Sequence, residues 1–96
     1  MVSIDEELQA AKAAKEALNV LLTTTPKSAV AATLRKANTA AILNFSRQGA
    51  AALNEARKNV STALSDLFHG PLKQGKINKA KGAVEEWISQ LRSAGS

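Results

Sequence analysis

A cluster of lysines near the carboxyl end of the chain has the clearest potential for chemistry. Lys73, Lys76, Lys79 and Lys81 lie within nine residues, and their ammonium groups could contact phosphates as point charges. The cluster contains no arginine, the usual bidentate reader of bases, and the chain has no tyrosine to stack on them. Two interpretations stay open for this lysine-rich segment, 73–81. It could be a non-specific anion contact or a solvated loop.

Two short patterns match catalytic motifs but lack their required context. The segment 70–76 fits the G-x-x-x-x-G-K of a phosphate-binding loop, but Ile77 stands where Ser or Thr would hold Mg²⁺, and no strand pattern precedes it. Ser65, Asp66 and His69 could meet on a helix, but a triad also needs an oxyanion hole and an enclosing pocket. We therefore expect no enzymatic activity, and a helix end around His69.

The residues that bind metals or cofactors are scarce. The chain has one histidine and no cysteine, so it offers neither a disulfide framework nor a cysteine zinc site. Glu85 and Glu86 are adjacent, and neighbouring positions on a helix point about 100° apart, so these two do not form a carboxylate pair. We expect no metal and no cofactor.

Four further bases and one tryptophan are candidate contacts with a partner. Arg35, Lys36, Arg57 and Lys58 could join the lysine cluster. If they share one face with it, a nucleic-acid partner is favoured, and if they scatter, a protein partner is favoured. Trp87 is the only tryptophan. It is expected to anchor the last helix in the core, with an exposed contact for a partner as the alternative.

Length and charge restrict the class of protein. The 96 residues suffice for a single domain over 1–96, with a net charge of +5 and a pI near 9.9. The segments 17–54 and 67–84 contain no acid, whereas the first residues are acidic, as a signal peptide is not. No apolar run approaches the roughly 20 residues that cross a bilayer. We expect a cytoplasmic protein that binds another protein, with nucleic acid as the alternative and no membrane.

Apolar spacing and capping residues predict helices throughout. The first helix is expected over about Ile4 to Leu22, with Ser3 and Glu6 forming a capping box. Thr25 and Pro26 suit the start of the next helix. Apolar positions then continue without a break in phase to Phe68, which favours one long helix over 26–68. The polar segment 46–49 favours a break into two helices instead, and both alternatives stay open.

The end of the chain predicts one more helix. Gly70 suits the left-handed position after a helix, and Pro71 cannot continue one. A loop is expected over 71–78, with Asn78 capping a last helix and a frayed tail over 93–96. The predicted fold is therefore all-α, a small bundle of three or four helices. Because alanine is the commonest residue, the core is thin, and a homodimer or another stabilising partner is expected.

Overall fold

Four stretches with apolar residues every three or four positions fold as helices in the computed structural model. They are α1 (Ile4–Val20), α2 (Ser28–Asn44), α3 (Ala51–Leu67) and α4 (Gln74–Gly95). The structure describes residues 2–24, 27–46 and 50–95, and these ranges contain no strand. The prediction of a small all-α bundle is confirmed, with four helices within the described ranges.

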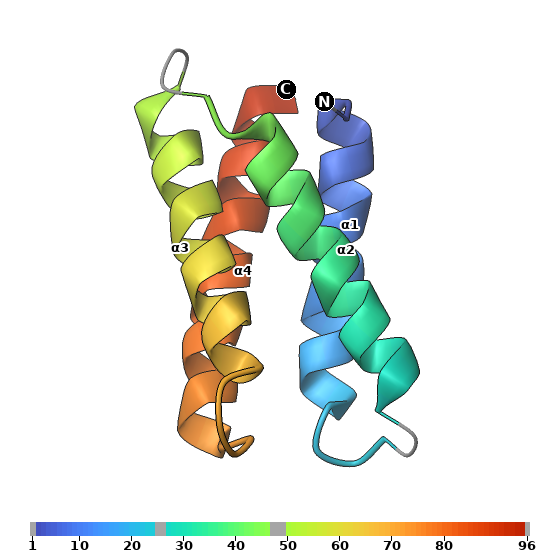
Figure 1. Cartoon of the computed structure of the whole chain (residues 1–96). Helices are drawn as coiled ribbons and strands as arrows, with labels where there is room; N and C mark the ends of the chain where they lie inside the picture. Colours follow the sequence, from blue (N-terminus) through green and yellow to red (C-terminus); the bar gives the residue numbers. More distant parts are fainter. Residues whose placement is uncertain (1, 25–26, 47–49, 96) are drawn as a thin grey trace.

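The helices run alternately up and down the bundle (Figure 1). α1 packs against α2 and α4, and α3 packs against α4 and α2. The bundle extends 37 Å along its long axis and 20 and 19 Å across it. Both chain ends lie at the end of the bundle where α2 is joined to α3, and α2 leans away from α3 toward the opposite end. None of the described helices is both long and apolar enough to span a membrane.

The core combines a few large side chains with many alanines. The largest apolar side chains that are buried completely or almost completely include Leu18, Leu34, Leu64, Trp87 and Leu91. Between them lie alanines with no exposed surface, among them Ala11, Ala14, Ala37, Ala41 and Ala80. A small side chain at a helix contact lets two helix axes approach closely, so alanine fills the core with little volume per residue.

The helix ends follow the capping residues. The Ser3 hydroxyl accepts a hydrogen bond from the Glu6 backbone N–H at 3.1 Å, which confirms the Ser3 half of the predicted capping box. The Glu6 carboxylate accepts from the Ser3 hydroxyl at 3.2 Å, rather than from the Ser3 backbone N–H as a capping box requires. After α3, Gly70 has φ +73°, the predicted left-handed conformation. Thr25 and Pro26, expected to start α2, lie outside the described residues.

The segment expected either as one helix or as two contains two helices. α2 ends at Asn44, Phe45 is extended with φ −62° and ψ 128°, and α3 starts at Ala51. The Asn54 side chain contributes to this break, because its Oδ1 accepts from the Ser46 N–H at 3.2 Å and its Nδ2 donates to the Ser46 carbonyl. Of the residues expected to form the break, Arg47, Gln48 and Gly49 lie outside the described part.

The boundaries predicted for the last helix are wrong at both ends. α4 begins at Gln74 rather than after Asn78, so most of the supposed lysine loop is helical. Ile77 lies in this first part of the helix and is almost fully buried, so packing holds the first turn in place. At the other end, helix continues to Gly95, so the described residues of the expected frayed tail, 93–95, are helical, and Ser96 lies outside the described part.

Candidate functional site

Arg57, a candidate phosphate contact, faces the core instead. Only 8 % of its surface is exposed. Its Nε donates to Glu7 Oε2 at 2.8 Å and its Nη2 to Glu7 Oε1 at 2.7 Å, a bidentate ion pair between α3 and α1. This guanidinium is therefore already bound to a carboxylate, and Arg57 is not a free base on the surface.

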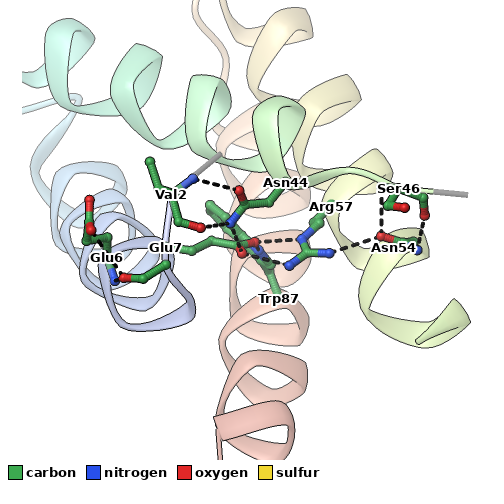
Figure 2. Close-up of polar contacts among 9 residues, drawn as sticks. Val2, Glu6, Glu7, Asn44, Ser46, Asn54, Arg57 and Trp87 are labelled. Atoms are coloured by element: carbon green, nitrogen blue, oxygen red, sulfur yellow. Dashed lines mark hydrogen bonds and ion pairs between the residues drawn. The ribbon is translucent and has the colours of Figure 1, made fainter. Parts of the chain in front are cut away.

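Glu7 is the centre of a polar network to which each helix contributes (Figure 2). Besides the pair with Arg57, it accepts a hydrogen bond from Asn44 Nδ2 of α2 at 2.7 Å and from Trp87 Nε1 of α4 at 2.7 Å. Burial alone would raise the pKa of this carboxyl. The four hydrogen bonds that it accepts, together with the charge of Arg57, outweigh burial and hold the pKa of Glu7 below its ordinary value.

The network continues toward the end of the bundle that holds the chain termini. Asn44 pairs with the backbone of Val2, accepting from its N–H at 3.0 Å and donating to its carbonyl at 2.9 Å. On the other side, Arg57 Nη1 donates to Asn54 Oδ1 at 3.0 Å, and Asn54 holds Ser46. Because both charges and both amides are satisfied inside the fold, this cluster fixes how the helices pack and offers no group to a substrate.

This network was not predicted from the sequence, although a signal for it was present. Glu7 precedes Ala11 and Leu18 on the buried stripe of α1, by four and eleven residues. Arg57 occupies the same kind of position between Leu53 and Val60 of α3. An acid and a base on two otherwise apolar stripes indicate a buried pair.

Trp87 has no exposed surface, which agrees with the expected core anchor and not with an exposed contact.

The two sequence patterns that match catalytic motifs are used structurally. His69 Nδ1 lies 2.8 Å from the backbone carbonyl oxygen of Ser65, not from its hydroxyl, and so closes the end of α3. Lys76 Nζ donates to the carbonyls of His69 and Pro71 and closes the turn between α3 and α4. No group of three or more metal-ligating side chains occurs among the described residues.

The remaining bases are divided among different parts of the surface. Lys36 lies with Asp5 and Glu6 along the groove between α1 and α2. Lys58 lies on the groove between α2 and α3. Lys79 lines a hollow at the end of α3 and the start of α4, together with Asp66. Acidic side chains therefore lie beside Lys36 and Lys79, and none lines the groove of Lys58.

The lysine cluster itself does not form one face. Lys79 and Lys81 are two positions apart on α4, so their side chains leave the helix in nearly opposite directions. Lys73 is exposed before the helix begins, and the ammonium group of Lys76 is held by backbone carbonyls. Arg35 stacks on Phe68 with its guanidinium carbon 5.3 Å from the ring centroid. The bases therefore scatter, the outcome that favours a protein partner.

The groove between α2 and α3 is the candidate site. It has a volume of about 350 Å³ and is lined from the α2 side by Ala41, Ile42 and Phe45. Ile42 is 56 % exposed and Phe45 43 % exposed, although both are large and apolar. The α3 side contributes Arg57, Lys58, Ser61 and Thr62. No acid lines this groove.

A larger groove of about 910 Å³ runs between α1 and α4, but it has a different character. Its charges are mixed, with Lys12 and Arg92 facing the same space as Glu16 and Glu85. Its one large apolar lining residue, Ile88, is buried. The α1–α4 groove is therefore an ordinary solvated surface, whereas the α2–α3 groove exposes apolar area to water.

The chain was compared with protein-family models, with curated proteins and with solved structures. None of the three comparisons finds a match.

Proposed function

We propose that the protein is a non-enzymatic interaction module that binds another protein through the α2–α3 groove. The observation that carries this proposal is the exposure of Ile42 and Phe45 on the wall of a concave surface. Covering such apolar side chains is favourable by roughly 25 cal/mol for each Å² removed from water. Residues at the centre of protein interfaces are typically large apolar or aromatic anchors in such pockets.

A nucleic-acid partner remains the second candidate, with less support. Non-specific binding of nucleic acid needs a continuous basic surface and exposed aromatic rings for bases. Here the lysines are distributed over several grooves, Trp87 is buried and Phe68 lies beneath Arg35. The cytoplasmic location expected from the sequence is part of the proposal that this protein binds another protein.

Self-association is another way to cover Ile42 and Phe45. In a symmetric dimer through this groove, each copy would present the same lining, so the two Lys58 side chains would approach each other without an acid from the groove. Like charges at an interface are unfavourable. We therefore favour a different protein as the occupant and treat the homodimer as an alternative outcome of the experiment.

The test is capture from nuclease-treated extract with three immobilised proteins: wild type, Ile42→Glu and Leu22→Glu. Leu22 is the matched control, because it is also apolar and 48 % exposed but follows α1 at the other end of the bundle. We expect one set of proteins to be retained by wild type and by Leu22→Glu and lost from Ile42→Glu.

Identical retention by all three proteins would contradict the proposal. Retention seen in a parallel capture from untreated extract, and absent after nuclease treatment, would support nucleic acid instead. Sedimentation of wild type and Ile42→Glu tests whether a homodimer forms through the groove. Such a dimer would dissociate on this substitution, and a dimer formed elsewhere would not.

A further inference from the structure

We infer that the occupant of the α2–α3 groove is an amphipathic helix with an acidic side chain beside its apolar face. This inference rests on the proposed function and adds the chemistry of the partner. The apolar face would cover Ile42 and Phe45, and the carboxylate would bind Lys58, which lines the same groove.

The charge of the groove favours an acid over a base. Lys58 is exposed and forms no ion pair, since the pair between Arg57 and Glu7 is the one salt bridge among the described residues. α2 contains no acid along its whole length, and the nearest acid along α3, Glu55, does not line the groove. A carboxylate placed here meets a positive charge without an acidic neighbour from the groove itself.

Arg57 lies beside this lysine in the lining of the groove. Its side chain makes three hydrogen bonds, two to Glu7 and one to Asn54, so each of its three nitrogens has an acceptor in the part of the chain that the structure describes. Its charge is already paired with Glu7, and the exposed Lys58 is the group that would bind the carboxylate.

The shape of the surface favours a helix as the bound segment. The described residues contain no strand, so no sheet edge is present to which an extended peptide could add. A groove between two helices suits a third helix with apolar anchors three or four positions apart.

The test uses a displayed library of helical peptides about 16 residues long, or about 24 Å. Each peptide has leucines at positions 1, 5, 8 and 12 (about one per turn) and random residues elsewhere. Binders to wild type are collected after depletion on Ile42→Ser, a neutral variant, so that they depend on the groove and the depletion does not itself select acidic peptides. We expect the selected peptides to be enriched in Asp and Glu beside the leucines.

The charge is then tested with one selected peptide. Lys58→Glu should weaken its binding roughly tenfold, because an attraction becomes a repulsion. Lys79→Glu is the matched control, an exposed lysine in a different hollow, and should change the affinity less than about twofold. The guanidinium N–H resonances of Arg57 should shift when the acidic peptide binds and not when a peptide with Gln in place of its acids is added.

The outcomes distinguish the two proposals. Groove-dependent peptides without acidic enrichment would overturn the inference about charge and leave protein binding supported. A selection that yields no groove-dependent peptide would overturn the helix as occupant, and the capture experiment then decides the proposed function alone. An unchanged affinity of the Lys58→Glu variant for the peptide would show that Lys58 does not contribute to its recognition.

Discussion

At the scale of single residues, the buried ion pair of Glu7 and Arg57 does most to fix how the helices pack. Both charges lie out of water, yet they compensate each other. Glu7 also accepts from Asn44 and Trp87 of two other helices, and Arg57 donates to Asn54 of its own helix. Such a pair is weak evidence for stability as a whole, because desolvation opposes the attraction. Removal of one partner is strongly destabilising, since the other charge then stays buried without compensation.

We therefore expect Glu7→Gln to lower the free energy of unfolding by about 3 kcal/mol, which urea denaturation would measure. Glu16→Gln is the control, because Glu16 is an exposed acid on the same helix, and its effect should stay within about 0.5 kcal/mol. Equal effects of the two substitutions would show that the network contributes nothing particular to the folded state.

The same carboxyl predicts how stability depends on pH. The pKa of Glu7 is lower in the folded protein than its ordinary value of 4.5, so the unfolded state binds the proton more readily. The stability that its ionised form confers is therefore present above this value and is lost as the pH falls toward the lower folded pKa. The difference in unfolding free energy between wild type and Glu7→Gln should be constant near neutral pH and shrink below 4.5. A difference that does not vary with pH would refute this.

At the scale of the helices, backbone conformation explains where elements end. Gly70 has φ +73°, which costs any other residue about 1 kcal/mol. A Cβ added there would find its nearest heavy atom, Lys76 Nζ, at 3.8 Å, so the cost comes from the backbone and not from a clash.

Gly70→Ala should therefore destabilise the protein by about 1 kcal/mol. Gly82→Ala is the opposite case, because Gly82 lies inside α4 with nothing within 4 Å of an added Cβ. Its replacement should stabilise by roughly 0.5–1 kcal/mol through helix propensity. Thermal unfolding of both variants measures the two signs. A Gly70→Ala variant as stable as wild type would contradict the left-handed strain at Gly70, and a loss of stability in Gly82→Ala would contradict the expected gain in helix propensity.

The helices could be predicted from the sequence because their signals are local. Ser3 and Glu6 are three residues apart, and Gly70 follows its helix directly, so the caps depend on neighbours along the chain. The start of α4 could not be predicted in the same way. Asn78 suits an N-cap, but Ile77 packs into the core and extends the helix beyond it, and that contact depends on the rest of the bundle.

The candidate site was predicted less well for the same reason. Arg57 and Lys58 are neighbours in sequence with the same charge, yet one is buried against Glu7 and the other faces solvent. Only the register of α3 against the other helices separates them. The sequence marks Ile42 and Phe45 only as large apolar residues, and which of them face solvent depends on how α2 packs against the other helices.

At the scale of the whole molecule, the net charge of +5 is spread around the bundle. We expect binding to duplex DNA at physiological salt to be no tighter than about 10⁻⁶ M, as for other non-specific contacts. Replacement of Lys73, Lys76, Lys79 and Lys81 by Ala should change it little. Fluorescence anisotropy at two salt concentrations measures both. Tight binding with a salt dependence that flattens in the fourfold variant would establish the nucleic-acid alternative.

The position of Trp87 gives this molecule a built-in optical reporter. It is the one tryptophan of a chain without tyrosine, so the near-ultraviolet emission of the protein comes from a single indole. That indole has no exposed surface, and its N–H donates to the Glu7 carboxylate at 2.7 Å. Its emission should shift to the red when the core opens, and its N–H should give one NMR signal protected from exchange with solvent. Both signals report on the one carboxylate at which all four helices meet.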